Sequence, residues 1–194
     1  MARPKEFDRD DALGRAIEVF SDRGYEGAST TALLEAMGIS RQSMYDTFGD
    51  KWQLYLECLR SYTADSIGQQ MRALNAASSP MKGLEAHLMR TVDEALARPV
   101  AKCLGVSAVS EFGRSDPEVT AITDVASRTL LGAVERRVAE AKAAGETPAD
   151  IDCREAANFV LATLTGIKVA ARAGGSAESL RGVAKMALRS LRRP

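Results

Sequence analysis

The chain has 194 residues, of which 45% are hydrophobic and 27% are charged, a balance typical of a folded protein rather than a disordered one. Its 26 lysines and arginines match its 26 aspartates and glutamates, so the net charge of +0 excludes a broadly basic protein. No segment approaches the roughly 18 consecutive apolar residues of a membrane span, and the N-terminal residues lack the apolar core of a signal peptide. We therefore expect a cytoplasmic protein that does not engage a membrane.

The cysteines and the histidine form no pattern typical of a disulfide framework or a metal site. Cys58, Cys103 and Cys153 are odd in number and widely spaced, and we expect them to be reduced. The only histidine, His87, has no cysteine or histidine at ligand spacing, so we expect it at the surface or a boundary, without a metal. We recognise no phosphate-cradling glycine loop and no nucleophile with its base, so we predict no cofactor and no enzymatic activity. An all-helical enzyme with a distributed active site is the alternative class.

Apolar residues recur at intervals of three and four along the chain, as in Leu13, Ile17 and Phe20, and no segment alternates with period two. The prolines lie where such segments start or stop, which is typical of helix boundaries. The pattern therefore predicts an all-α fold. We expect helices at residues 9–23, 30–37, 41–48, 51–74, 81–97, 102–113, 118–144, 153–173 and 177–192.

Three short helices follow one another within the first fifty residues. Gly24 is expected to end the first helix in a left-handed conformation, and the hydroxyls of Ser29 and Thr30 can cap the second. Gly38 ends this second helix, and Ser40 can cap the third. This spacing predicts a tight helix-turn-helix.

The third of these helices has one apolar and one polar face. Met44 and Phe48 are expected to anchor it, next to Leu33, Leu34, Met37 and Ile39 of the preceding segment. The free face carries hydrogen-bonding side chains that suit the major groove of DNA, namely Arg41, Gln42, Ser43, Tyr45, Asp46 and Thr47. Residues 1–52 hold only seven lysines and arginines against ten aspartates and glutamates. Any DNA contact must therefore come from a few placed cations, hydroxyls and helix N-termini.

These residues resemble the DNA-binding domain of the TetR/AcrR family of transcriptional regulators over about residues 9–60. The segments that carry the resemblance are 16–20 (AIEVF), 24–30 (GYEGAST), 38–40 (GIS), 44–45 (MY), 48–51 (FGDK) and 54–55 (LY). The resemblance implies an N-terminal helix-turn-helix DNA-binding domain, residues 1–50, and a larger helical ligand-binding and dimerisation domain, residues 51–194. It implies a homodimer that binds double-stranded palindromic operator DNA and, as a repressor, releases it when a small molecule binds. An activator or an architectural protein without an inducer is the alternative.

By the same resemblance, Thr30, Ser40, Tyr45 and Lys51 hold phosphates. The bases are read by Arg41, Gln42, Ser43, Asp46 and Thr47. Asp46 departs from the family, since many relatives carry an aromatic residue there. Its carboxylate either accepts from the N4 amine of cytosine or only orients Arg41 or a helix terminus, and both interpretations stay open.

The two last helices are the candidates for the dimer contact, because the family builds a four-helix bundle from two helices of each subunit. The residues that line them are Ala157, Val160, Leu164, Ile167, Leu180, Val183, Ala187 and Leu191. The alternative is that these apolar stripes face the core of their own domain. Gly132 and Gly166 lie inside helical segments, where either another helix crosses closely or a ligand finds space, and we favour close packing.

The effector site can be assigned only from the faces of helices that are expected to point inward. The candidates are Tyr62, Met89, Cys103, Ser107, Phe112 and Thr163. Their mostly aliphatic surroundings predict a largely apolar small molecule, although the same residues would equally build an ordinary core. Cys103, near a helix N-terminus, either senses oxidants or electrophiles, as the corresponding cysteine does in some relatives, or is inert.

Overall fold

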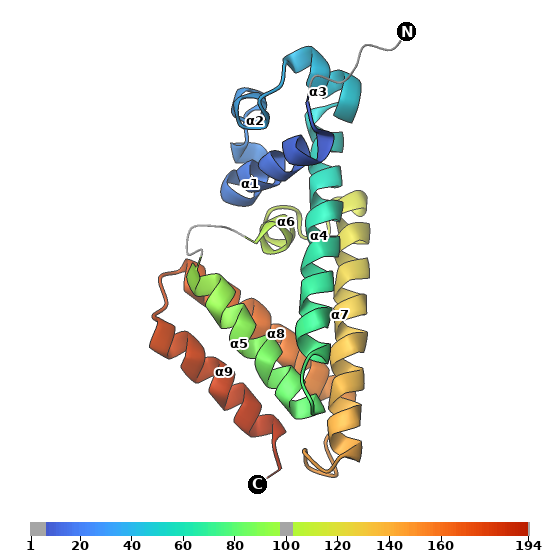
Figure 1. The fold of residues 1–194 in the computed structure, drawn as a ribbon, viewed down its shortest axis with the longest axis vertical. Helices are drawn as coiled ribbons and strands as arrows, with labels where there is room; N and C mark the ends of the chain where they lie inside the picture. Colours follow the sequence, from blue (N-terminus) through green and yellow to red (C-terminus); the bar gives the residue numbers. More distant parts are fainter. Residues whose placement is uncertain (1–6, 98–102, 194) are drawn as a thin grey trace. The chain divides into compact units, whose positions relative to one another are not determined.

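The computed structural model describes residues 7–97 and 103–193, which form nine α-helices and no strand (Figure 1), so the all-α prediction is confirmed. The helices are α1 (Arg9–Gly27), α2 (Thr30–Met37), α3 (Arg41–Phe48), α4 (Lys51–Asn75), α5 (Pro80–Ala97), α6 (Leu104–Phe112), α7 (Pro117–Ala143), α8 (Cys153–Arg172) and α9 (Ala177–Leu191). The predicted helix bounds agree with these within one residue, except at the end of α1 and the start of α6. The predicted start of α6, residue 102, lies outside the described residues. No helix in the described ranges combines the length and the apolarity needed to cross a membrane.

Internal packing divides the chain into two compact units. The head unit lies within residues 1–64 and 101–124, and the body unit within residues 65–100 and 125–194. The head unit therefore contains not only α1, α2 and α3 but also the first part of α4, all of α6 and the start of α7. A functional boundary at residue 50 stays a prediction.

The core of the head unit gathers apolar side chains from all of its helices. Leu33 and Met37 of α2 and Met44 and Phe48 of α3 are buried, as predicted. Leu34 and Ile39 are partly buried against the same core. Further members are Ala12, Leu13, Ala16, Phe20, Ala28, Leu54, Tyr55, Leu56, Cys58, Leu59, Leu104, Ala108 and Val119.

Capping residues set the ends of the short helices. Ser29 Oγ accepts from Ala32 N at 3.2 Å, and Ser40 Oγ accepts from Ser43 N at 3.1 Å, so both predicted caps are confirmed. Gly38 ends α2 with φ 67°, the left-handed conformation that glycine adopts without steric cost. Gly24 also has a positive φ of 71°, and its ψ of -176° is not helical, so the regular part of α1 ends there as predicted, although not in the left-handed helical conformation. The chain kinks at Gly24 and then makes a further helical turn to Gly27.

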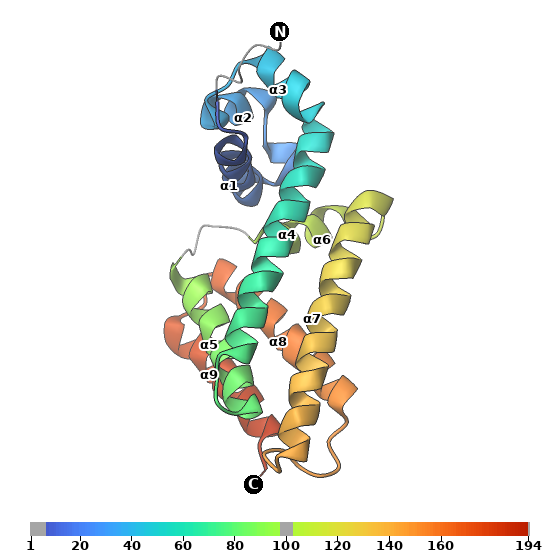
Figure 2. The same cartoon turned by 45° about the vertical axis from the view of Figure 1, so that its right-hand side comes forward.

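The body unit is built around α5, α8 and α9, which pack against one another in all three pairings (Figure 2). Leu84 and Leu88 of α5 and Val134 and Val138 of α7 are fully buried in its core. Leu74, near the end of α4, joins the same core.

The three cysteines are free, as the sequence predicts. Cys58 is fully buried in the head unit, and burial raises the pKa of its thiol well above the usual range. The thiolate is the reactive form of cysteine, and a raised pKa keeps the thiol protonated. Cys58 therefore acts as a packing residue of the core and not as a reactive group. Cys103 and Cys153 are partly exposed.

His87 is fully buried on α5, so its expected place at the surface or a boundary is wrong. The reason is helical periodicity: Leu84, Leu88 and Thr91 lie on the same buried stripe. Among the described residues neither ring nitrogen of His87 has a hydrogen-bond partner. Burial lowers the pKa of its imidazole to about 4, and the positive charges of Lys168 and Arg90 act in the same direction.

We predict that His87 makes stability depend on pH. The folded-state pKa of about 4 lies below the ordinary 6.5, so the unfolded chain takes up the proton first as pH falls. The stabilising contribution is present above pH 6.5 and lost between pH 6.5 and about 4, by at most about 3 kcal/mol. In His87→Leu, which has a similar volume and no titrating group, unfolding free energies from urea denaturation at fixed protein concentration should fall less steeply over this window. Equal slopes for both proteins would contradict the prediction.

Candidate nucleic-acid interface

The third helix buries one side and leaves the other accessible within the described chain. Met44 is fully buried and Phe48 is 6% exposed, because both contribute to the head core. On the opposite side Arg41, Gln42 and Tyr45 are exposed, with Tyr45 at 45%. Asp46 is also exposed, whereas Ser43 and Thr47 are half-buried. The polar face that the sequence predicts is thus available to a partner.

Hydrogen bonds organise this polar face before any partner binds. Gln42 Nε2 donates to Asp46 Oδ1 at 2.8 Å, one helical turn further along. The hydroxyls of Ser40 and Ser43 lie 2.9 Å apart and form a second hydrogen bond. Asp46 therefore orients the amide of Gln42. Neither interpretation from the sequence, a contact with cytosine or the orientation of Arg41 or a helix terminus, named Gln42 as its partner. A carboxylate accepts several hydrogen bonds, so an additional contact with a base stays open.

Three of the four predicted phosphate contacts lie at the starts of helices. Thr30 is the first residue of α2, Ser40 is the N-cap of α3, and Lys51 is the first residue of α4. Helix N-termini carry partial positive charge and free N–H groups, so these places favour anions. Asp50 Oδ1 accepts from Gln53 N at 2.8 Å and caps α4. Tyr45 is exposed in the middle of α3.

The ammonium group of Lys51 rests on an aromatic cluster. Lys51 Nζ lies 4.3 Å from the ring centroid of Tyr25, a cation–π contact. The Tyr25 ring in turn lies 5.1 Å from the rings of both Trp52 and Tyr55, and 5.9 Å from the ring of Phe112. Phe112 was predicted to bind an effector, but its ring packs in this cluster within the head unit.

Glu111 connects α6 to the kink of α1. Its Oε2 accepts from Tyr25 N at 2.9 Å and its Oε1 accepts from Glu26 N at 2.8 Å. A Cβ added to Gly24 would lie 2.8 Å from Glu111 Oε2, so only glycine leaves room for the carboxylate there. Sequence reasoning missed this contact because it joins residues 86 and 85 positions apart.

The predicted effector residues divide between the two units. Tyr62, Cys103, Ser107 and Phe112 belong to the head unit, and Met89 and Thr163 to the body unit. Ser107 is 6% exposed and its hydroxyl has no hydrogen-bond partner among the described residues. Thr163 Oγ1 donates to the carbonyl of Phe159 at 2.8 Å. Cys103 is the N-cap of α6, and its role as a sensor stays a prediction.

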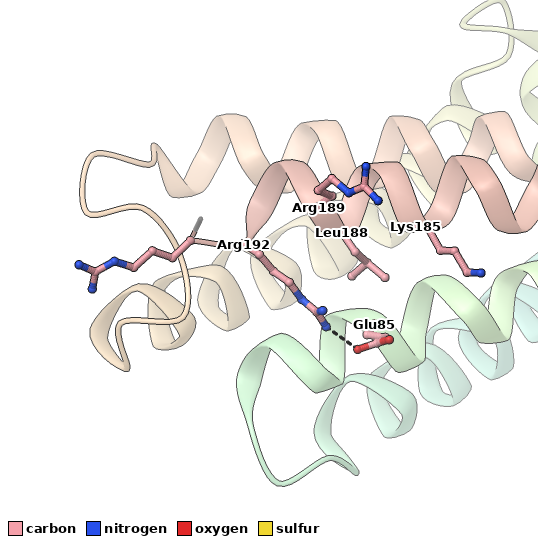
Figure 3. Close-up of a pocket in the computed structure, with 6 residues that line it drawn as sticks. Glu85, Lys185, Leu188, Arg189 and Arg192 are labelled. Carbon is pink, nitrogen blue, oxygen red and sulfur yellow. Dashed lines mark hydrogen bonds and ion pairs between the residues drawn. The ribbon is translucent and has the colours of Figure 1, made fainter.

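An open pocket in the body unit has a different lining (Figure 3). It is formed by Glu85, Lys185, Leu188, Arg189, Arg192 and Arg193, and contains none of the predicted effector residues. Arg192 Nη2 lies 2.6 Å from Glu85 Oε2, which links the end of α9 to α5. The charged lining does not match a largely apolar effector.

Most of the predicted dimer residues lie in the core of the body unit. Those that are buried there are Ala157, Val160, Leu164, Ile167, Leu180, Ala187 and Leu191, whereas Val183 is 45% exposed. Burial favours the alternative that these stripes face their own core. Large apolar side chains that stay exposed on α8 and α9 are Phe159, Val169, Val183 and Met186.

The two glycines inside helices also differ from expectation. Gly132 and Gly166 are exposed, and a Cβ at either would meet nothing within 4 Å. The preferred interpretation, close packing by another helix, is therefore wrong within this chain.

Comparisons with known proteins agree with the geometry of the head unit. Residues 12–58 match the family model described as bacterial regulatory proteins, tetR family, and residues 80–187 match the model of the tetracyclin repressor-like, C-terminal domain. The uncharacterized HTH-type transcriptional regulator YezE of Bacillus subtilis (strain 168) is 36% identical over 147 residues, or 75% of this chain and 76% of that protein. The HTH-type transcriptional repressor ComR of Escherichia coli (strain K12) is 24% identical over 189 residues, covering 96% of this chain and 90% of that protein.

A solved structure is similar over nearly the whole chain. It contains a cysteine mutant of the TetR family transcriptional regulator CifR complexed with 26bp double-strand operator DNA. The TM-score is 0.83 at 35% identity, and the match covers 98% of this chain and 100% of that chain. Two family models, a relative at 36% identity and this structure confirm the resemblance carried by residues 9–60. The chain therefore belongs to the TetR family of DNA-binding transcriptional regulators.

Proposed function

We propose that this chain is a ligand-responsive repressor that binds palindromic operator DNA as a homodimer and releases it when a small molecule binds the C-terminal domain, residues 51–194. The observation that carries this proposal is the accessible polar face of α3, where Arg41, Gln42 and Tyr45 are exposed opposite buried Met44. The likeness to CifR, whose structure contains operator DNA, supports the same partner here.

The two kinds of DNA contact fall to different residues. Arg41, Gln42, Ser43, Asp46 and Thr47 lie along α3 and read bases, since the major groove presents a distinct set of donors and acceptors for each base pair. A second set of residues holds phosphates. Its members lie at helix starts or on α3 and are Thr30, Ser40, Tyr45 and Lys51. A twofold dimer presents two copies of α3 to half-sites about 34–36 Å apart, which accounts for a palindromic operator.

The dimer contact is proposed on the exposed side of α8 and α9. Phe159, Val169, Val183 and Met186 are between 44% and 62% exposed, although large apolar side chains usually avoid water. Gly166 is exposed on the same helix with open space beside it, so a helix of a second subunit can approach closely there. Two helices from each subunit would then form a four-helix, isologous interface.

The effector is proposed to be a largely apolar small molecule. Ser107 is the best supported of the six candidate residues, because a buried hydroxyl without a protein partner is costly unless a ligand or a solvent molecule satisfies it. The direction of regulation rests on relatives such as ComR, which is named a repressor. An activator or architectural protein without an inducer is the alternative.

The experiment that tests the proposed function is selection of bound sequences from random duplex DNA, followed by a screen of small molecules for release. A symmetric consensus is expected, together with a compound that weakens binding. DNA must then weaken the compound by the same factor, since coupling between two sites is reciprocal. Recovery of no consensus would contradict operator binding, and a compound without reciprocity would contradict the allosteric part.

We predict that substitutions in the two contact sets have different effects on DNA binding. Lys51→Gln and Tyr45→Phe remove phosphate contacts and should weaken binding to all duplexes alike. For Lys51→Gln, the slope of log affinity against log salt should fall by about 0.9 per subunit. Arg41→Ala and Gln42→Ala should change which bases are preferred, by about 1–3 kcal/mol at one position. Repeating the selection with each variant measures this, and one common behaviour for all four would contradict the division of roles.

A second prediction concerns the dimer. A carboxylate placed on the exposed side of α9, in Val183→Asp or Met186→Asp, should weaken association at least about tenfold, because a charge would be buried without a partner. Val125→Asp on α7 is the matched control, since Val125 is 57% exposed and lies outside the proposed interface. Sedimentation equilibrium of the three variants distinguishes the cases. Unchanged dimers in both α9 variants would exclude this interface.

A further inference from the structure

We propose that Glu111 is a positioning residue for DNA binding. Its carboxylate, on α6, clamps the backbone of residues 25–26 so that the Tyr25 ring holds the ammonium of Lys51 at the start of α4. This inference rests on the phosphate contact of Lys51 in the proposed function. It adds a residue that lies outside the helix-turn-helix and outside every set of contacts assigned above.

The Glu111 carboxylate acts as an N-terminal cap for the helical turn that follows Gly24. After the kink at Gly24, the turn that ends at Gly27 begins with N–H groups that have no partner within the helix. Glu111 accepts from two of them, Tyr25 N at 2.9 Å and Glu26 N at 2.8 Å. Hydrogen bonds to a carboxylate are roughly twice as strong as neutral ones, so this pair fixes the turn. The positive φ of Gly24 and the lack of a side chain there admit the carboxylate.

Helix α6, which carries Glu111, also fixes the ring of Tyr25. Phe112 follows Glu111 on α6, and its ring lies 5.9 Å from that of Tyr25. Trp52 and Tyr55 of α4 complete the support, each at 5.1 Å. The backbone and the ring of Tyr25 are therefore held by adjacent residues of one helix, and Lys51 Nζ rests on the ring at 4.3 Å.

A lysine side chain held in this way loses less conformational freedom when it meets a phosphate. Ordering a long flexible side chain at an interface reduces affinity, and prior ordering removes that loss. If the Glu111 carboxylate only stabilised the fold, its loss would not change the ionic contact between Lys51 and a phosphate. The salt dependence of DNA binding therefore separates a positioning role of Glu111 from a purely structural one.

The test uses Glu111→Gln, which keeps one acceptor oxygen and the length of the side chain, in the full chain with its selected duplex. We expect affinity to fall about threefold to tenfold per subunit, the factor for ordering one long side chain. The slope of log affinity against log salt should fall by up to about 0.9 per subunit. In a Lys51→Gln background, Glu111→Gln should change neither quantity further. Hydrogen exchange at the amides of Tyr25 and Glu26 should be faster in Glu111→Gln without DNA.

Asp152→Asn is the matched control. Asp152 Oδ1 accepts from Glu155 N at 2.8 Å and caps α8 in the body unit, so this variant replaces a charged acceptor by a neutral amide oxygen, as Glu111→Gln does, but away from the head. It should lower stability while leaving affinity and salt slope unchanged, and an equal effect on DNA binding would overturn the positioning role.

The positioning role is also overturned if Glu111→Gln leaves the slope unchanged while Lys51→Gln lowers it, in which case the proposed function stands. If Lys51→Gln itself has no effect on affinity or slope, the phosphate assignment fails and this inference fails with it.

Discussion

The interface depends on the burial of two side chains, Met44 and Phe48, under a helix of eight residues. A helix this short is not stable alone in water, so its existence depends on packing and caps. Each buried side chain contributes about 1.5–3 kcal/mol and together they fix the rotation of α3 about its axis. That rotation alone decides that Arg41, Gln42 and Tyr45 face outward. The accessibility of the proposed DNA-reading face is therefore a consequence of how the opposite face packs.

Local signals predicted most of this arrangement. The caps Ser29 and Ser40 and the left-handed Gly38 act within a few residues of their partners, so the sequence placed α2 and α3 without error at either end. Contacts between distant segments could not be predicted in this way. The bonds of Glu111 with residues 25 and 26 span more than eighty positions, and no periodic pattern signals them. His87 was misplaced although its stripe of apolar neighbours was visible.

The α8 and α9 helices show a second limit of pattern reading. Each has a deeply buried stripe that includes Leu164 and Leu180 and a separate exposed apolar side that includes Phe159 and Met186. Periodicity identifies the stronger apolar stripe, and in both helices this is the stripe that packs in their own core. The weaker, exposed side becomes recognisable only when the burial of each residue is known.

Because α6 belongs to the head unit, the elements that support the proposed DNA-binding surface are not limited to residues 1–50. Glu111 and Phe112 hold Tyr25 from one face of α6, and the same helix carries buried Ser107. A ligand that favours another position of α6 would act directly on the support of Lys51. Such a ligand shifts the equilibrium only by its difference in affinity between the two positions.

The most direct measurement is a crystal structure of the protein with the duplex recovered by selection. The outward face of α3 should lie in the major groove of each half-site, with Arg41 or Gln42 within hydrogen-bond distance of base edges. A duplex bound through another surface, such as the arginines at the end of α9, with α3 left facing solvent, would contradict the assignment of α3 as the reading helix.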